Sequence, residues 1–376
     1  MAVDDTPPPR RSRRRGHGRA TLADVARVAE VTKVTVSRYL REPAKVAAAT
    51  AERIRAALAS TGYVPNKQAG LLASGRSNIV AALIPNLSHS IFGETVQALS
   101  EALQAAGHEL LLASTGYSPE REEEQLRALL GWAPLGLVVT GRHHTDGTRR
   151  LMADAHAAGT PVVEVWDHQP DEASPFAQIG FNHAQVGRAM ARHLLAAGHR
   201  TLAYVDSGVD ADFRAHERGA AFADEARRAG ASIRLQRAAK GDPFDAGRQA
   251  LRELLSAGPD AGPTGHSVPG TAALPGRPSA VACANDHLAC GLLMQAQAQG
   301  LRVPQDLAVL GFGDFPVGRQ LQPALSTVHP PSQQIGWATA QALLAALQSG
   351  SAPVGQALPW QLIVRGSTLA HPPAKT

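Results

Sequence analysis

Residues 21–43 read TLADVARVAEVTKVTVSRYLREP, and this stretch decides the fold of the N-terminal part of the chain. Thr21 followed three positions later by Asp24 is typical of a capping box at the start of a helix. The apolar residues behind it recur at helical spacing on one face: Leu22, Val25, Ala26 and Ala29. A tight connection then leads into a second helix, for which Thr32 is the expected N-cap.

The second helix is expected to have two different sides. Val36 and Leu40 share an apolar side, and the other side carries Lys33, Val34, Ser37, Arg38 and Arg41. Such a helix suits the major groove of DNA, where Arg and Lys donate to guanine and hydroxyls reach phosphates. A solvated surface helix is the alternative that this pattern leaves open. With the helical segment that follows, the pattern predicts a helix-turn-helix domain over residues 21–64 and a hinge helix or linker over 65–76.

The positive charge of the chain is concentrated at its N-terminal end. Residues 1–76 hold 15 Lys and Arg against 6 Asp and Glu, whereas the remainder holds 22 against 26. Residues 1–20 contain six arginines and almost no apolar side chains, so we expect a disordered basic tail. This tail would attract DNA through phosphate neutralisation, or it is a solubilising extension with no part in specificity.

Composition excludes several classes of protein. Apolar residues make up 44% of the 376 positions, enough for sizeable cores, yet no apolar run reaches the ~18 residues of a membrane span. The N-terminal end lacks the apolar segment of a secretory signal. The two cysteines, Cys283 and Cys290, are expected to be reduced, so we predict a cytoplasmic protein, nucleoid-associated when DNA-bound.

Beyond residue 77 the chain alternates between strand and helix patterns, which is typical of parallel α/β sheets. Strands are expected at 80–85, 109–114, 136–140, 161–165, 201–205, 280–284 and 307–311. Helices are expected at 91–106, 120–130, 149–158, 183–197, 212–228, 244–256 and 286–299. Ten of the 22 residues at 257–278 are Gly or Pro, which indicates an inserted loop. No P-loop, dinucleotide fingerprint, nucleophile elbow or Cys/His metal spacing accompanies the pattern, so we expect neither an enzyme nor a cofactor or metal.

The chain resembles the LacI/GalR bacterial repressors from Thr21 to about Thr368. The most specific matching stretches are TLADVA, VTKVTVSRYL, GYVPN, ANDHLACG and GLRVPQDLAVLGF. The resemblance implies that Lys33, Val34 and Arg38 read bases. It places Thr21, Thr35, Ser37, Lys45, Thr50, Asn66 and Lys67 at phosphates or groove edges. Leu72 matches a leucine that the family wedges into the minor groove, where an inserted apolar side chain kinks the duplex.

The same resemblance implies a periplasmic-binding-protein-like core for effector binding and dimerisation over residues 77–368, with a short tail at 369–376. Two parallel-sheet lobes are expected, the first formed by about 77–167 and 312–329 and the second by 168–311 and 330–368. The chain is expected to cross between them near 166–170, 312–316 and 328–331. Ligands of open α/β sheets bind beyond the carboxyl ends of the strands, so the effector should lie between the lobes.

Loops that follow the strands supply the candidate effector-binding residues. These are Asn86, Ser90, Phe92, Tyr117, Arg142, His143, Trp166, Asn182, His216, Phe244, Asn285 and Asp314. For any one of them a capping or packing role is the alternative.

Two positions depart from the family pattern. The family commonly has an Arg three residues before a helix glycine, here Gly219, and this chain has His216. An Asp commonly follows the family's Gly-aromatic dipeptide, and here Gly313 intervenes and displaces Asp314 by one. Loss of that carboxylate lowers the repulsion toward an anionic ligand.

The stretches GYSPEREEEQLRALLGWAPLGLVVT and IGFNHAQVGRAM further resemble the subgroup of gluconate-utilisation repressors. We therefore expect a sugar acid such as gluconate, with a neutral sugar or a purine as the alternative. A transport-type binding protein is a remote alternative, since it would lack residues 21–73.

The resemblance also implies a homodimer on a pseudo-palindromic double-stranded operator, with no membrane partner. Residues 66–73 would be helical only on DNA, and the effector would shift the population between two states. The C-terminal HPPAKT carries no heptad repeat, so no tetramer zipper is expected.

Overall fold

The computed structural model describes residues 20–64, 77–88, 91–169, 174–256 and 277–369. The chain divides into two compact units, Met1–Gly75 and Arg76–Thr376, and each is described by itself. The predicted basic tail up to residue 19, the predicted hinge at 65–76 and most of the inserted loop lie outside the described residues.

The first unit is a small helical domain. It contains α1 (Leu22–Val28), α2 (Lys33–Arg41), a 3₁₀ turn (Pro43–Lys45) and α3 (Ala48–Thr61). The capping box of Thr21 and Asp24 starts α1, and the Thr32 hydroxyl accepts from the Thr35 amide to start α2. The core is formed by one apolar face from each helix: Val25, Ala26, Ala29, Val36, Ile54 and Ala57. Two short helices and a third that supports them form the predicted helix-turn-helix arrangement.

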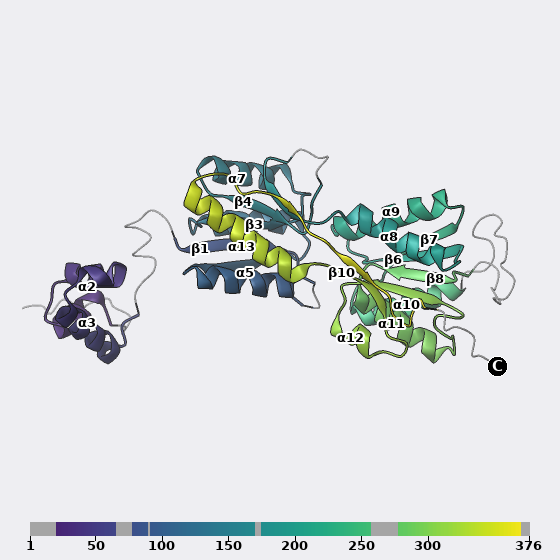
Figure 1. The fold of residues 1–376 in the computed structure, drawn as a ribbon, viewed down its shortest axis with the longest axis horizontal. Helices are drawn as coiled ribbons and strands as arrows, with labels where there is room; N and C mark the ends of the chain where they lie inside the picture. The colour runs from purple at the N-terminus through teal and green to yellow at the C-terminus, as the bar shows by residue number, and fades with distance from the viewer. Residues whose placement is uncertain (1–19, 65–76, 89–90, 170–173, 257–276, 370–376) are drawn as a thin grey trace, which may run out of the picture. The chain divides into compact units, whose positions relative to one another are not determined.

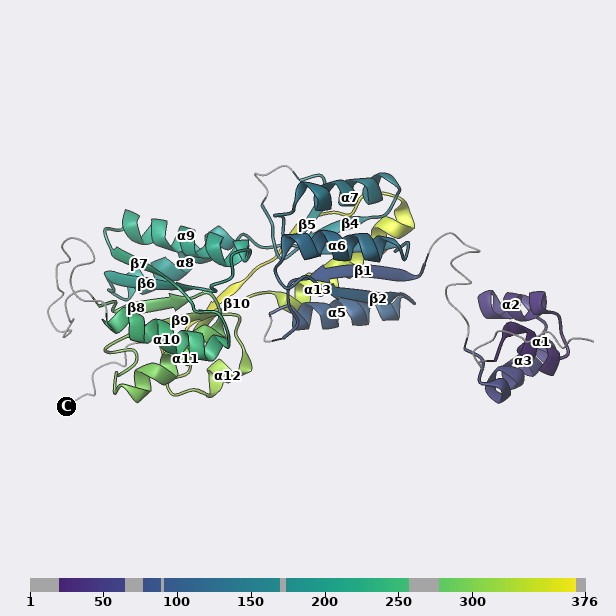
Figure 2. The same cartoon turned by 180° about the vertical axis from the view of Figure 1, so that it is seen from behind.

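The second unit contains two lobes, each built on a six-stranded sheet. The first sheet has the order β11-β5-β4-β3-β1-β2. Its strands are β1 (Ile79–Ile84), β2 (Glu109–Ser114), β3 (Gly136–Thr140), β4 (Val162–Val165), β5 (Ala177–Gly180) and β11 (Gln356–Ala357). One face is covered by α5 (Gly93–Ala105) and α13 (Ser332–Ser349), which pack side by side (Figure 1). The other face is covered by α6 (Pro119–Leu130) and α7 (Asp146–Ala157), seen from behind in Figure 2.

The second sheet has the order β12-β10-β9-β8-β6-β7. Its strands are β6 (Thr201–Asp206), β7 (Ser232–Arg237), β8 (Ala280–Cys283), β9 (Ala308–Phe312), β10 (Ser326–His329) and β12 (Gln361–Ile363). The helices α8 (His183–Ala196) and α9 (Phe213–Arg228) pack together on one face. The helices α10 (Pro243–Ser256) and α11 (Asp286–Ala298) pack on the other, and α12 (Pro316–Gln320) leads into β10. All strand pairs except β10–β12 are parallel, as the alternating pattern predicts.

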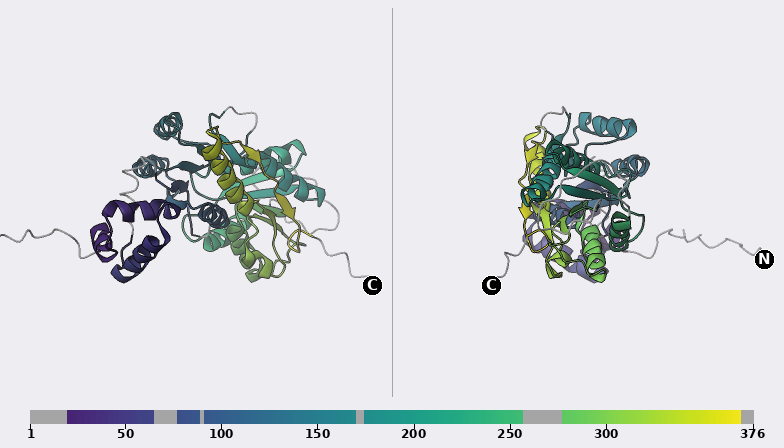
Figure 3. Two further views of the ribbon diagram at one scale, coloured as in Figure 1. Left: turned by 60° about the vertical axis from the view of Figure 1, so that its left-hand side comes forward. Right: turned by 90° about the vertical axis from the view of Figure 1, so that its right-hand side faces the viewer.

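The chain passes between the lobes at residues 181–182, 330–331 and 358–360. One predicted crossing, 328–331, includes the second of these. The crossings predicted at 166–170 and 312–316 are wrong, because β5 returns to the first sheet and β9 continues to β10 within the second. Residues 312–329 therefore belong to the second lobe and 330–357 to the first, the reverse of the predicted assignment. The C-terminal segments, yellow-green to yellow in Figure 3, run along one side of both lobes.

The central strands are buried on both faces, so they consist of continuous apolar residues. The segments IVAALI of β1 and GLVVT of β3 are buried along almost their whole length. Within the described ranges, no helix combines the length and apolar character needed to cross a membrane.

Candidate functional site

The surface of α2 combines cationic and apolar side chains. Lys33 and Arg38 are exposed, and the Val34 side chain is 66% exposed. Val36, on the opposite side, is completely buried against α1 and α3. The helix therefore has an inner face that fixes it to the domain and an outer face that is open to a partner.

The other described DNA-binding candidates lie on the helices, on the 3₁₀ turn or at the N-cap of α1. The Thr21 amide and hydroxyl donate to the Asp24 carboxylate at 2.9 and 2.7 Å, and Thr35 contacts the Thr32 hydroxyl. Lys45 pairs with Glu42 at 2.7 Å and stays exposed, whereas Ser37 and Thr50 are half-buried. Asn66, Lys67 and Leu72 lie outside the described residues.

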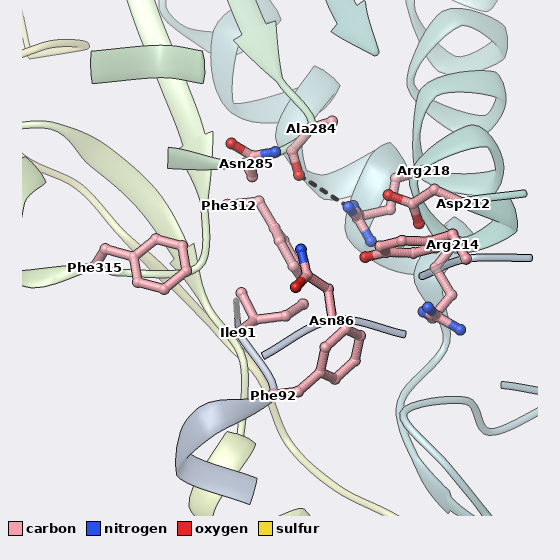
Figure 4. Close-up of a pocket in the computed structure, with 11 residues that line it drawn as sticks. Asn86, Ile91, Phe92, Asp212, Arg214, Arg218, Ala284, Asn285, Phe312 and Phe315 are labelled. Atoms are coloured by element: carbon pink, nitrogen blue, oxygen red, sulfur yellow. Dashed lines mark hydrogen bonds between the residues drawn. The ribbon is translucent and has the colours of Figure 1, made fainter. Parts of the chain in front are cut away.

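The second unit holds a cavity where the carboxyl ends of strands from both sheets meet (Figure 4). Its empty volume, part of which is open to solvent, is about 480 Å³. The first lobe contributes Asn86, Ile91, Phe92 and Tyr117. The second lobe contributes Asp212, Arg214, Arg218, Ala284, Asn285, Phe312 and Phe315.

Two buried arginines provide the positive charge of this cavity. Arg214 is 8% exposed; it lies over the Phe92 ring, 4.0 Å from a carboxylate oxygen of Asp167. Arg218 is 3% exposed and lies over the Phe312 ring, with 3.9 Å between the guanidinium carbon and the ring centroid. Both project from α9, and among the described residues Asp212 is the one carboxylate that lines the cavity. The cavity lining is therefore net cationic.

Three further side chains add polar groups to the cavity lining. Asp212 and Asn285 cap α9 and α11, each through Oδ1, so the second oxygen and the amide nitrogen are the atoms that can reach a ligand. Burial, followed by the charge of Asp212, raises the pKa of Tyr117, which keeps its phenol protonated. These groups suit a small ligand that carries both hydroxyls and a negative charge.

Two separate parts of the chain match known protein families. Residues 21–66 match bacterial regulatory proteins of the lacI family, and residues 191–368 match a periplasmic binding protein-like domain. The HTH-type transcriptional regulator GntR of Pseudomonas aeruginosa is 38% identical over 330 residues, covering 87% of this chain and 89% of the relative. The chain belongs to the LacI family.

Two further relatives agree. The GntR regulator of Escherichia coli strain K12 is 32% identical over 335 residues, covering 89% of this LacI-family chain and 93% of that protein. A crystal structure of a LacI-family regulator from Silicibacter pomeroyi superposes with a TM-score of 0.81 at 30% identity, covering 93% and 99% of the two chains. The chain is thus a DNA-binding transcriptional regulator and not an enzyme.

Four predicted effector-binding residues of this LacI-family protein lie together around the cavity: Asn86, Phe92, Tyr117 and Asn285. His143 lines an adjacent cavity of about 390 Å³ that shares Tyr117 and Arg214 with the first. Its ring contacts Phe213 of the other lobe, with centroids 4.8 Å apart. Ser90 lies outside the described residues.

Arg142 and His216, predicted to make the cleft electropositive, are not among the residues that line either described cavity. Arg142 donates to Glu217 at 3.2 Å, and His216 lies 3.2 Å from Asp206. His216 is two residues from both cavity arginines, so a helix of about 100° per residue turns it to the opposite side. The positive charge comes instead from Arg214 and Arg218.

Three other predicted residues have packing or capping roles in the described structure. Trp166 is completely buried between Phe92 and Phe181. Phe244 packs edge-on against His287, and Asn182 caps α8 by accepting from the Gln185 amide. Trp166 follows β4, Asn182 precedes α8 and Phe244 lies in the first turn of α10, but none of them is among the residues that line the described cavities.

Asp314 is a buried carboxylate within an ion cluster and is not among the residues that line the cavity. Its carboxylate accepts from Arg365 at 2.6 Å, from Arg319 at 2.7 Å and from His329 at 3.1 Å. Burial alone would raise the pKa of Asp314, but the hydrogen bonds from Arg365 and Arg319 outweigh it and lower the pKa. Its role in the structure is to tie β9 and β10 to the C-terminal segment.

Arg214 and Arg218 were missed because both lie inside a helix and the prediction considered strand-end loops. The signal that could have identified them is their spacing of i, i+4 on a face that otherwise carries Ala215, Ala221 and Phe222 among its buried residues. Within the described residues no group of three or more His, Cys, Asp or Glu side chains is arranged to hold a metal ion.

Proposed function

We propose that this regulator is a repressor that binds a small sugar acid, gluconate or a close relative, in the interlobe cavity. The observation that carries the proposal is the pair of buried guanidinium groups, Arg214 and Arg218, against one carboxylate, Asp212, among the described residues that line the cavity. Charge-assisted hydrogen bonds from Arg suit a carboxylate, and the amides and phenol suit hydroxyls. The aromatic rings of Phe92, Phe312 and Phe315 would pack on the carbon chain.

The position of Gly313 supports an anionic ligand. Resemblance to the family leads one to expect an Asp there, and this chain has a glycine with a φ of +130°. A Cβ at this position would lie 2.8 Å from the Phe315 ring, so an apolar ring occupies the space that a side chain would need. The carboxylate expected to accept the hydroxyls of a neutral sugar is therefore replaced by an apolar wall.

The relatives support gluconate within this class of ligand. The chain resembles the gluconate-utilisation subgroup in sequence, and regulators named GntR match it at 38% and 32% identity over most of its length. On this basis the closing or opening of the lobes would depend on the sugar acid.

For DNA, we propose base contacts from Lys33, Val34 and Arg38, with Thr21, Thr35, Ser37, Lys45 and Thr50 near the backbone. One α2 helix reads one half-site, so two chains related by a two-fold axis would read a pseudo-palindromic operator. Light scattering should give twice the mass of one chain; a monomer at the concentrations used for DNA binding would contradict the dimer.

Thermal unfolding of the purified chain tests the choice of effector. The panel comprises gluconate, 6-phosphogluconate, glucose, sorbitol and adenine. A ligand at ~100 times its dissociation constant adds about 2.7 kcal/mol of stability, which gives a clear shift of the transition. We expect a shift with the sugar acids and none with the others. A shift with glucose, sorbitol or adenine alone would overturn the sugar-acid proposal and leave the DNA-binding regulator intact.

A further inference from the structure

Asp167 is a buried carboxylate at the junction of the two lobes. It follows β4 in the first lobe and is 2% exposed. Its Oδ1 lies 3.9 Å from Nε of Arg142 and 3.9 Å from Nε2 of His183, and its Oδ2 lies 4.0 Å from Nη1 of Arg214. Arg142 belongs to the first lobe, whereas His183 and Arg214 lie at the starts of α8 and α9 in the second. The carboxylate therefore faces groups from both lobes.

Hydrogen bonds do not satisfy this carboxylate. Oδ2 is buried and has no hydrogen-bond partner among the described residues. The three contacts above are all longer than the ~3.2 Å of an N–H···O hydrogen bond. Buried polar atoms are nearly always hydrogen-bonded, and an ionised carboxylate without such bonds is costly. When Asp167 is ionised, any rearrangement that brings it water or a closer guanidinium is therefore favoured.

The backbone at Asp167 is fixed within the first lobe. The Trp166 amide donates to the Ile179 carbonyl of β5 at 2.9 Å. A Cβ at Gly180 would lie 2.6 Å from the Asp167 amide nitrogen, so the two segments are closely packed. Arg214, by contrast, is carried by α9 of the second lobe. A movement of the lobes relative to each other therefore changes the surroundings of the Asp167 carboxylate.

The cations near Asp167 compensate its charge only in part. Arg142 shares its charge with Glu217, to which its Nη2 donates at 3.2 Å. His183 is neutral, because burial and the neighbouring arginines lower its pKa well below the usual value. Arg214 contributes its charge from 4.0 Å. Attraction to these groups is therefore weaker than in a hydrogen-bonded ion pair.

Burial outweighs this attraction. It raises the pKa of Asp167 to about 6, although the charges of Arg214 and Arg142 oppose the rise. The carboxylates of Glu217 and Glu164 reinforce it. An aspartate in water has a pKa of about 3.9, so an arrangement that hydrates Asp167 would bind the proton less tightly. By linkage, protonation favours the described arrangement and ionisation favours the hydrated one.

We propose that Asp167 is a proton-sensitive switch of the lobe arrangement. Protonated, it stabilises the junction as described; ionised, it shifts the lobes toward an arrangement in which its carboxylate is hydrated. The effector cavity lies at the same junction, so ligand binding would depend on pH through Asp167. The switch works whatever the effector is, and it does not rest on the choice of a sugar acid.

The test is a distance measurement between the lobes of the full chain. Spin labels are attached to cysteines introduced by Arg149→Cys in α7 and Arg227→Cys in α9, whose side chains are 57% and 56% exposed. The native Cys283 and Cys290 are buried and should remain unlabelled. Labelled chains are mixed with an excess of unlabelled chain, so that each distance comes from within one chain. Pulsed electron paramagnetic resonance then gives the distance distribution at pH 7 and pH 5.

In the wild type, the ratio of the described arrangement to the hydrated one should rise about tenfold between pH 7 and pH 5. Asp167→Asn is neutral at both pH values and should keep the acidic distribution at each of them. Asp167→Leu, which is neutral and of similar size, carries the same test if Asp167→Asn fails to fold.

The matched control is Asp306→Asn. Asp306 precedes β9, at the end of that strand remote from the cavity, and pairs with Arg302 at 2.7 Å. This variant should show the wild-type response to pH. A wild-type distribution that is the same at pH 7 and pH 5 would overturn the proposal. So would a pH response that persists in the neutral variants of Asp167. Either result leaves the proposed function intact, and a chain that binds no sugar acid can still show the switch.

Discussion

Arg38 and Val34 lie on the same face of α2, and we expect them to make different kinds of contact with DNA bases. An exposed guanidinium can donate to guanine, whereas Val34, 66% exposed, offers only apolar contact. Arg38→Ala should cost about 1–3 kcal/mol of operator binding, roughly 5- to 150-fold in Kd, without loss of stability. The measurement is fluorescence anisotropy with an operator selected from random DNA, and Arg228→Ala is the control. Equal Kd values for Arg38→Ala and the wild type would exclude a base contact.

His144 makes the stability of the first lobe depend on pH. Its ring is 1% exposed, 2.7 Å from a Glu122 oxygen and 3.6 Å from a Glu164 oxygen. Burial alone would lower its pKa, but the hydrogen bond to Glu122 and the nearby carboxylates of Glu122 and Glu164 raise it to about 9. A raised histidine pKa stabilises the fold fully below about pH 6.5, and this contribution is lost as the pH rises through about 9.

The loss amounts to about 3 kcal/mol across this window. Urea unfolding of the wild type and of His144→Gln at pH 6 and pH 9 measures it. The wild type should lose more stability than the variant, whose remaining pH dependence reports the other titrating groups. An equal loss of unfolding free energy between pH 6 and pH 9 in the two proteins would mean that His144 is not held protonated by the two glutamates.

At the scale of elements, the close approach of α8 to α9 positions the cavity arginines. A Cβ at Gly187 of α8 would lie 2.1 Å from the Arg218 carbonyl oxygen, a backbone atom that cannot move away alone. Gly187→Ala should therefore separate the helices, lower stability by at least about 1–3 kcal/mol and weaken gluconate binding. Gly93→Ala is the control, since a Cβ there meets nothing within 4 Å. Thermal unfolding measures the stability of both variants. Equal stabilities of Gly187→Ala and Gly93→Ala would contradict this packing.

Local signals predicted most elements well. Thr21, Thr32, Asn182 and Asn285 cap the helices that follow them, and each side chain satisfies an amide that the first turn leaves unpaired. Long apolar runs identified the central strands β1, β3 and β9. Helix caps and apolar strands depend on residues that are close together in the sequence, so the sequence alone indicates them.

The assignment of segments to lobes could not be predicted in the same way. The strands β5 and β10 have four residues each, and β11 has two, too few for a clear period. Which sheet a short strand joins depends on pairing with a distant strand, such as β11 with β5. Only some of the cavity residues could be predicted, for a related reason. The strand ends indicated Asn86 and Asn285. The direction in which Arg214 and Arg218 point depends on how α9 packs, which the local sequence does not show.

At the scale of the whole core, an ion pair joins the two lobes beside the cavity. Arg142 follows β3 of the first lobe, and its Nη2 donates to Glu217 on α9 of the second at 3.2 Å. The side chains are only 11% and 20% exposed, so solvent screens the pair weakly. A double-mutant cycle with Arg142→Gln and Glu217→Gln should give a coupling of about 0.5–3 kcal/mol in urea unfolding. Additive effects would show that the pair does not hold the lobes together.

The central claim is that a sugar acid in the cavity controls DNA binding by the first unit. Its most direct test is the Kd of the full chain for a selected operator duplex, measured by anisotropy without ligand, with saturating gluconate and with sorbitol. Coupling between two sites of about 1–3 kcal/mol should change the operator Kd roughly 5- to 150-fold with gluconate and leave it unchanged with sorbitol. An operator Kd that saturating gluconate does not alter would contradict the account.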